Sequence, residues 1–273
     1  MVHVSFDIYI CIYRRGYLVQ VLKAGDYSTA CRAILFDKDG TLIDFKNMWL
    51  VWLDYMFTAL QKEYQLTKNI IKDFEEAVGV KLDKRWVASS GVMASGCMDS
   101  LRRSMAQCLA AYGVDPEEAV SGFDVMVKAS ETEVDWPAIT HPVPGLEQFL
   151  YKLKDRGIKV AVTTADTTSR AEDTLCSLGL ASHFDAVVGA DRVSSTKPAP
   201  DMALLACELL DVHPMDAVVV GDNITDMQMG KSAGVAGVIG VLTGVCQVSQ
   251  LEALADAVVD SVGELKLEDV GQG

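Results

Sequence analysis

Positive charge is the first thing this 273-residue chain has little of. Its 24 Lys and Arg residues face 38 Asp and Glu residues, which gives a formal net charge of −14. Nucleic acids and anionic membrane surfaces are bound through basic patches, so we expect no nucleic-acid partner and no membrane partner. A small anionic substrate is compatible with this charge only where local cations or a metal reverse the field.

Paired cysteines, spaced histidines and long apolar runs are also lacking. The seven cysteines form no CxxC pair, so they predict reduced thiols rather than a disulfide framework. The four histidines show no metal-ligand spacing. The richest apolar run, GVAGVIGVLTGV at 234–245, is too short and too rich in glycine for a membrane span, and the N-terminus has no signal-peptide pattern. We therefore expect a cytoplasmic protein.

Short apolar runs alternate with helical patterns from Ala33 onward. The apolar runs are AILFD, IKVAVTT, FDAVVGAD, DAVVVGD and GVIGVLTG. Helical spacing is found at 142–157, 168–178, 200–210, 224–233 and near 249–263. Apolar strands that alternate with helices predict an α/β fold, a doubly wound, Rossmann-like parallel sheet with helices on both faces.

A mainly helical block interrupts this alternation. Residues 46–78 and 97–130 have spaced apolar positions and few turn residues. We therefore expect a helical cap domain over 45–139, inserted into a catalytic core made of 31–44 and 140–273. Residues 1–30 form an N-terminal extension that either pairs as a β-hairpin or is loosely attached.

Polar residues stand where several of the expected strands end. In a doubly wound sheet, ligands bind beyond the carboxyl ends of the strands. The residues at these ends are Asp37 and Asp39, then Thr163, Thr164 and Asp166, and finally Asp222 and Asp226. A lysine, Lys197, lies in the proline-rich segment SSTKPAPD just before a helix. These are the residue types that a phosphate group and a hard cation need.

The spacing of the acids favours two carboxylate pairs. Asp37 and Asp39 are two residues apart, so an extended backbone would turn both to one side, and Gly40 permits a tight departure of the chain. Asp222 and Asp226 are four apart and would share one face of a helix. Crowded carboxylates repel one another unless a cation joins them, and oxygen-only ligation indicates Mg²⁺ rather than zinc. Taken singly, DKDG is about equally compatible with a surface turn, a lone Lys197 is most often a solvated lysine, and Gly221-Asp222 is compatible with a helix cap.

The ordered set of motifs resembles the haloacid dehalogenase superfamily of phosphatases, in its phosphoglycolate phosphatase-like branch with a helical cap. The segments that carry the resemblance are FDKDGTLID, VTTAD, TKPAPD, VVVGDNITDMQMGKSAG and GVLTGV. Together they extend from Ala33 to about Leu265 and leave out the first 30 residues.

The resemblance implies a role for each catalytic residue. Asp37 would be the nucleophile that forms an aspartyl-phosphate, and Asp39 would be the general acid and base. Thr164 and the backbone amide of Ala165 would hold phosphate oxygens. Lys197 would neutralise the charge of the nucleophile and of the phosphoryl group.

The resemblance also implies a magnesium site. Its ligands would be Asp37, the carbonyl of Asp39 and Asp222, with Asp226 acting directly or through water. Phosphoryl transfer depends mainly on positioning and electrostatic stabilisation, which agrees with a cation held beside a carboxylate nucleophile.

Two positions qualify the resemblance. Lys38 stands where the family most often has an apolar residue, and we expect its side chain to point away from the site. Asp39 argues against the dehalogenases and phosphonatases of the superfamily, which lack an acid at this position.

The expected cap offers a few cations for a second anionic group of the substrate. They are Lys46, Arg85, Arg102 and Arg103, although for any one of them an exposed basic residue on a helix is the favoured interpretation. Arg102 and Arg103 are adjacent on a helix, about 100° apart, so we expect at most one of them to contact a ligand.

The function that these features predict is that of a phosphoric monoester hydrolase. It would use Mg²⁺ and an aspartyl-phosphate intermediate to hydrolyse a small phosphorylated metabolite, with 2-phosphoglycolate as the favoured candidate. A phosphomutase of the β-phosphoglucomutase type would share every motif. A non-catalytic binding protein on the same fold is a third alternative, which the complete set of catalytic acids disfavours.

Overall fold

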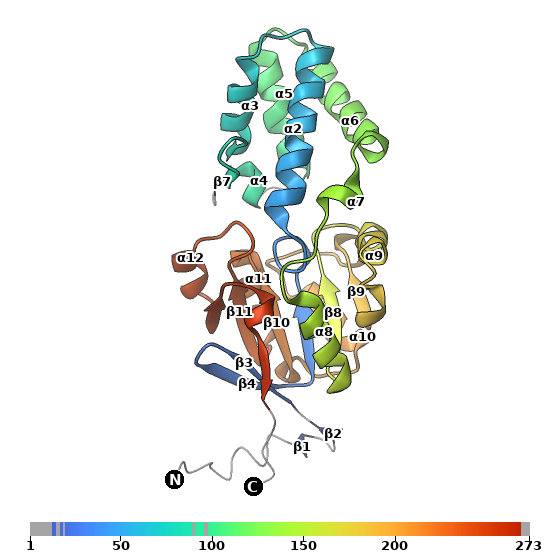
Figure 1. Ribbon diagram of the computed structural model, residues 1–273, viewed down its shortest axis with the longest axis vertical. Coiled ribbons are helices and arrows are strands. Elements are labelled where there is room, and N and C mark those ends of the chain that lie inside the picture. Colours follow the sequence, from blue (N-terminus) through green and yellow to red (C-terminus); the bar gives the residue numbers. More distant parts are fainter. Residues whose placement is uncertain (1–12, 15–16, 19, 89–90, 96–97, 269–273) are drawn as a thin grey trace. The chain divides into compact units, whose positions relative to one another are not determined.

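The computed structural model describes residues 13–14, 17–18, 20–88, 91–95 and 98–268 (Figure 1). The chain forms two compact units, one made of Met1–Ile43 with Pro142–Gly273 and the other of Asp44–His141. We call them the sheet unit and the helical unit and describe each by itself. Among the described helices, none combines the length and the apolar character needed to cross a bilayer.

A six-stranded parallel sheet is the centre of the sheet unit, in the order β12-β11-β10-β5-β8-β9. The strands are β5 (Ala33–Phe36), β8 (Lys159–Thr163), β9 (Ala186–Val188), β10 (Ala217–Gly221), β11 (Gly237–Val241) and β12 (Ala257–Val259). The central strands β5 and β10 are buried throughout, as expected for a parallel sheet that is covered on both faces. The α/β fold class predicted from the sequence is confirmed.

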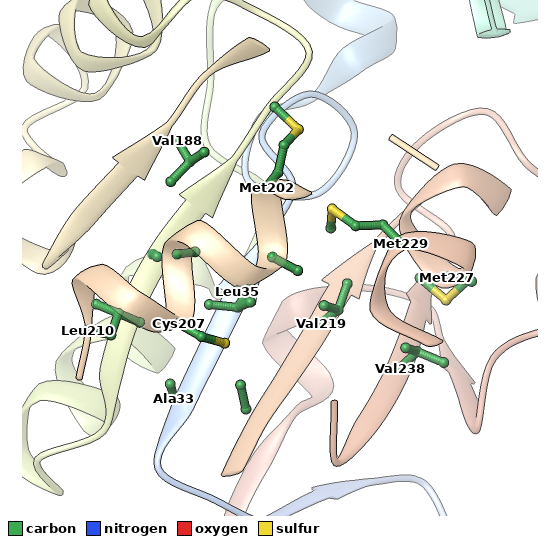
Figure 2. Close-up of a cluster of buried hydrophobic side chains, with 14 of the residues drawn as sticks. Ala33, Leu35, Val188, Met202, Cys207, Leu210, Val219, Met227, Met229 and Val238 are labelled. Atoms are coloured by element: carbon green, nitrogen blue, oxygen red, sulfur yellow. The ribbon is translucent and has the colours of Figure 1, made fainter. Parts of the chain in front are cut away.

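Helices on the two faces bury the sheet. They are α8 (Leu146–Asp155), α9 (Thr168–Ser177), α10 (Asp201–Leu209), α11 (Ile224–Ala233) and the short α12 (Val248–Glu252). Side chains two apart on a strand share a face, so Ala33 and Leu35 contribute to one apolar cluster together with residues of α10 and α11 (Figure 2). On β5, Phe36 instead meets Phe149 of α8 edge to face, with ring centroids 6.5 Å apart. This double cover holds the carboxyl ends of the strands in fixed positions.

The helix expected near 249–263 is wrong over most of its length. Helix α12 ends at Glu252, and β12 then pairs in parallel with β11. The Asp256 carboxylate accepts a hydrogen bond from the Val238 amide at 2.8 Å, and the Asp256 amide donates one to the Val238 carbonyl at 2.8 Å. These two bonds attach the edge strand to the sheet, which helical spacing alone does not indicate.

Part of the expected N-terminal extension belongs to the sheet unit. Strands β3 (Gln20–Ala24) and β4 (Tyr27–Cys31) form an antiparallel hairpin, and β13 (Lys266–Glu268) pairs with β3. The Tyr27 hydroxyl donates a hydrogen bond to the Ala236 carbonyl at 3.3 Å. Residues 20–31 are therefore attached to the core rather than loose, whereas residues 1–12, in which the expected hairpin would begin, lie outside the described residues.

Helices dominate the second unit. They are α2 (Phe45–Glu63), α3 (Ile70–Val78), α4 (Val92–Ser95), α5 (Met98–Ala111), α6 (Pro116–Glu133) and α7 (Trp136–Ile139), with a small hairpin of β6 (Val80–Lys81) and β7 (Trp86–Val87). The buried Trp52 donates to the Ser130 hydroxyl at 3.0 Å and so links α2 to α6. Phe57 and Phe74 pack with ring centroids 5.3 Å apart. Trp52 and Phe57 of α2 are therefore core residues of this unit.

Candidate active site

The functional side chains of the sheet unit gather beyond the carboxyl ends of neighbouring strands. Asp37 follows β5, and its amide donates to the Val220 carbonyl of β10 at 2.9 Å. Thr164 follows β8, and its amide donates to the Val188 carbonyl of β9 at 3.0 Å. The strand hydrogen bonding therefore continues into the first polar residues and positions them at the edge where α/β sheets bind ligands.

Three carboxylates form the centre of the site. Asp37, Asp222 and Asp226 each offer an oxygen atom, and these atoms lie within 4.8 Å of one another. Asp222 and Asp226 are almost fully buried. Burial raises the pKa of Asp37 to about 6, against the opposing charge of Lys197. Burial, followed by the charges of Asp37 and Asp226, raises the pKa of Asp222 well above its ordinary value.

This cluster fits a hard divalent cation. An all-oxygen donor set with crowded, buried negative charge is what Mg²⁺ prefers over zinc or copper. The Asp222 carboxylate lies in a notch between two glycines, because a Cβ at Gly244 would overlap it and a Cβ at Gly40 would lie 2.7 Å from it. Gly40 has a φ of +93°, a conformation that side-chain-bearing residues rarely adopt. Asp222 and Asp37 are therefore the residues that would hold the ion, with Asp226 beside them.

Lys197 supplies the positive charge of the site. Its ammonium lies 2.6 Å from Asp37 Oδ1 and 2.5 Å from Asp226 Oδ1, and its side chain is only 7% exposed. Burial lowers the pKa of Lys197, but the charges of Asp226 and Asp37 outweigh it and hold this pKa above its ordinary value. The lysine stays protonated and orients the Asp37 carboxylate.

Helix α11 fixes Asp226 by a capping box. The Asp226 carboxylate accepts a hydrogen bond from the Asn223 amide at 3.0 Å, while the Asn223 side chain accepts from the first turn of the helix. Gly221 permits the approach, because a Cβ there would lie 2.4 Å from the Asp226 side chain. The sequence predicted that Asp222 and Asp226 would come together, and the capping box fixes the position of Asp226 in that pair.

The turn after β8 presents the expected phosphate-binding residues. Thr164 is buried, and its hydroxyl accepts a hydrogen bond from the Asp166 amide at 3.2 Å. Ala165 between them is exposed. The exposed Ala165 beside the buried Thr164 is compatible with phosphate binding at this turn. A phosphate-binding role for Thr164 and the Ala165 amide stays a prediction.

Lys38 does not point away from the site, so that expectation is wrong. Its ammonium lies 2.6 Å from Asp39 Oδ1 and 3.8 Å from Asp166 Oδ2. The extended backbone ends at Phe36, and the Lys38 carbonyl instead accepts from the amides of Leu42 and Ile43 at 2.9 and 3.1 Å. The alternation of side chains along a strand therefore no longer applies at residue 38.

Sequence reasoning gave no role to the segment after β11. The Val245 amide donates to Asp222 Oδ2 at 3.3 Å, and the Thr41 hydroxyl donates to Asp222 Oδ1 at 3.4 Å. The Thr243 hydroxyl donates to the Gly40 carbonyl. Gly244 in GVLTGV was the available signal, because it follows the end of an apolar strand, as the other site residues do.

The three arginines of the helical unit have partners within that unit. Arg102 pairs with Asp99 and, at 3.2 Å, with Asp124, while Arg103 pairs with Asp99 at 2.7 Å. Both arginines thus converge on one carboxylate, although we expected them to diverge, because positions three and four residues along a helix both border the first. Arg85 donates to the Asn47 side chain at 3.2 Å. Lys46 is exposed.

The sequence matches a known protein family and named relatives. The family model described as haloacid dehalogenase-like hydrolase matches residues 31–234. A Dickeya dadantii (strain 3937) protein named "Probable phosphatase IndB" is 39% identical over 233 residues, covering 85% of this chain and 90% of that protein. The phosphoglycolate phosphatase of Aquifex aeolicus (strain VF5) is 29% identical over 204 residues, 74% of this chain and 81% of that protein.

Solved structures share the fold. A subfamily IA, variant 1 hydrolase of the haloacid dehalogenase superfamily from Geobacter sulfurreducens PCA superposes with a TM-score of 0.59 at 20% identity, covering 86% of this chain and 94% of that one. The β-phosphoglucomutase from Clostridium difficile superposes with a TM-score of 0.54 at 21% identity, covering 86% and 92%. The resemblance stated from the motifs and the expectation of a phosphatase enzyme are both confirmed.

Proposed function

The chain belongs to the haloacid dehalogenase-like hydrolase family, and from this premise we propose that it is a Mg²⁺-dependent phosphatase of a small phosphorylated metabolite. The first substrate to test is 2-phosphoglycolate, because relatives that match over about three quarters of this chain are phosphoglycolate phosphatases. The observation that carries the proposal is the partly buried Asp37 carboxylate, which Lys197 orients at 2.6 Å inside a cluster of acids.

The proposed reaction has two steps, which begin and end with the same protein groups. An Asp37 oxygen attacks phosphorus, the ester P–O bond breaks, and the leaving oxygen takes a proton from the Asp39 carboxyl group. Water then attacks the phosphorus of the aspartyl-phosphate, gives a proton to the Asp39 carboxylate and releases inorganic phosphate, which regenerates Asp37.

The other residues supply positioning and charge in this proposal. Lys197 orients the nucleophile and offsets charge on the phosphoryl oxygens, and Thr164 with the Ala165 amide binds those oxygens. A bound Mg²⁺, held by Asp37, Asp222, the Asp39 carbonyl and Asp226, would neutralise charge on the phosphoryl group. Electrostatic stabilisation of this kind is the main source of catalysis in phosphoryl transfer.

Release of inorganic phosphate from a panel of phosphorylated metabolites tests the proposal. We expect release from 2-phosphoglycolate or another small phosphomonoester in Mg²⁺, and none from the Asp37→Asn variant. The Lys159→Met variant is a suitable control, since Lys159 pairs with Asp185 at 3.0 Å at the exposed first residue of β8. Absence of release from the whole panel by the wild-type protein would refute the phosphatase proposal.

A phosphomutase of the β-phosphoglucomutase type is the alternative that the same assay separates. A mutase returns the phosphoryl group to a sugar, so it needs a sugar bisphosphate for turnover and releases little phosphate. Steady phosphate release without a sugar bisphosphate supports the phosphatase. Interconversion of sugar phosphates that depends on a bisphosphate would support the mutase instead.

A further inference from the structure

A chain of alternating charges leads from the surface of the sheet unit to Asp39. Arg170 Nε lies 3.6 Å from Asp166 Oδ1, and Asp166 Oδ2 lies 3.8 Å from the Lys38 ammonium. The Lys38 ammonium then lies 2.6 Å from Asp39 Oδ1. Each cation in this chain therefore sits next to a carboxylate, and the chain ends on the proposed general acid and base.

Lys38 is the member of this chain that is most completely buried. Its side chain is 3% exposed, against 57% for Arg170. A buried ammonium is stable only when carboxylates or other acceptors pair with it, and here Asp39 and Asp166 do so. Within the described residues, the Asp39 carboxylate has no hydrogen bond other than the one from Lys38. The orientation of Asp39 thus depends on this lysine.

Asp166, the other carboxylate in this series of charges, is held on the turn after β8 that we expect to bind phosphate. Asp166 Oδ1 also accepts a hydrogen bond from the Thr167 amide at 2.9 Å, and the Asp166 amide donates to the Thr164 hydroxyl. The Asp166 carbonyl accepts from the Ala190 amide at 2.8 Å. Asp166 is therefore fixed on the same turn that carries Thr164, and Lys38 connects this turn to Asp39.

We propose that Lys38 is a positioning residue, which holds the Asp39 carboxyl group in place for proton transfer by tying it to Asp166. The inference rests on the proposed phosphatase function and deepens it. Proton transfer depends first on the position of the acid within hydrogen-bond reach of the leaving oxygen. Loss of Lys38 should therefore impair the departure of leaving groups that need a proton, and should spare those that do not.

The leaving group provides the test. An alkyl phosphate expels an alkoxide, which must be protonated as it departs, whereas p-nitrophenyl phosphate expels a stable phenolate. The value of kcat/KM reports the steps up to phosphoryl transfer to Asp37 and excludes the later hydrolysis of the aspartyl-phosphate. The experiment therefore compares kcat/KM of wild type and Lys38→Met for p-nitrophenyl phosphate and for the alkyl phosphate that wild type hydrolyses fastest.

We expect Lys38→Met to lose about 10- to 100-fold more kcat/KM on the alkyl phosphate than on p-nitrophenyl phosphate, a part of the full contribution of general acid catalysis. Lys38→Arg, which keeps the cation, should recover a share of this selective loss. Lys159→Met makes the same chemical change at an exposed lysine of the same unit and should leave both substrates unaffected. The Mg²⁺-induced rise in melting temperature, measured alongside, should be the same in Lys38→Met and wild type.

Asp166→Asn keeps the test decisive if the buried Lys38 variant does not fold, since Asp166 is partly exposed. On its own it should show a smaller selective loss on the alkyl phosphate. Where Lys38→Met folds, the double variant should show no selective loss beyond that of Lys38→Met. Equal losses on both substrates, or no loss on the alkyl phosphate, would overturn the role of Lys38 while the phosphatase function stands. A wild-type protein that hydrolyses neither substrate would overturn both proposals.

Discussion

Replacing Lys197 by methionine should strongly destabilise the protein when no metal is bound. Methionine has a similar length and an apolar side chain, so the variant removes the charge and little else. The ammonium lies 2.6 Å from Asp37 Oδ1 and 2.5 Å from Asp226 Oδ1. Without it, these two carboxylates and Asp222 remain crowded together in a buried site.

The expected magnitude follows from the burial of these groups. Removing one partner of a buried ion pair costs about 3–5 kcal/mol, because the other partner is left as an uncompensated charge. For a chain of this size, each kcal/mol lowers the melting temperature by about 2–4 °C, so a decrease of about 10 °C is expected. The Lys159→Met control removes an exposed ion pair, for which about 0–1 kcal/mol is expected.

Calorimetry of both variants in chelator, and again with increasing Mg²⁺, measures this effect. A bound cation restores positive charge to the cluster, so the melting temperature of Lys197→Met should rise more with Mg²⁺ than that of wild type. A Lys197→Met protein that melts within about 2 °C of wild type in chelator would refute the reasoning. Such a result would mean that repulsion among these carboxylates does not destabilise the folded state.

Four further predictions concern the same cluster. Asp37→Asn should abolish phosphate release while the circular dichroism spectrum stays that of wild type, and near-normal release would exclude Asp37 as the nucleophile. Chelator should abolish activity, Mg²⁺ should restore it and Ca²⁺ should inhibit it, because Ca²⁺ accepts looser and higher coordination; full activity in metal-free buffer would contradict the magnesium site. Gly244→Ala should push the Asp222 carboxylate out of its notch and so weaken Mg²⁺ binding. The Mg²⁺ concentration needed for a given rise in melting temperature should increase about tenfold or more, which corresponds to roughly 1.4 kcal/mol of binding free energy. An unchanged Mg²⁺ titration would show that the notch is not needed. Burial raises the pKa of Asp37 to about 6, so protonation of this group stabilises the metal-free fold at low pH, and this stabilisation is lost as the pH rises through 6. The melting temperature of wild type, measured relative to that of Asp37→Asn, should therefore increase as the pH is lowered from 8 to 5. A difference that does not change with pH would contradict the raised pKa.

The edge strand β12 shows where local patterns are ambiguous. The letters DAVV begin one residue before β9, β10 and β12, so that the Asp precedes each strand and AVV opens it. At both edges of the sheet the Asp carboxylate accepts from a neighbouring strand, Asp185 from the Val160 amide and Asp256 from the Val238 amide. The repeated letters were a usable signal for the strand at Ala257–Val259. We did not predict this strand because the helical pattern near 249–263 overlaps it.

Lys38 shows a different limit. Residues one apart on a strand point to opposite sides, and this rule predicted that Lys38 would lie away from its acidic neighbours. The rule holds only while the backbone stays extended, and β5 ends at Phe36. Where the turn begins, and where a long flexible side chain then reaches, depends on acceptors such as Asp166 that lie far away in the chain.

The sequence by itself determined the strands of the sheet other than β12, most of their helical cover and the polar residues at their carboxyl ends, because period, apolar runs and strand ends are local features of the chain. It was enough to place Asp37, Thr164 and Asp222 at one edge of one sheet. Only the tertiary structure decided which side chains touch, such as Lys197 with Asp37 across 160 residues, and Gly244 with Asp222. Contacts of this kind are made by segments that meet only after the sheet has formed, so no periodicity in either segment records them.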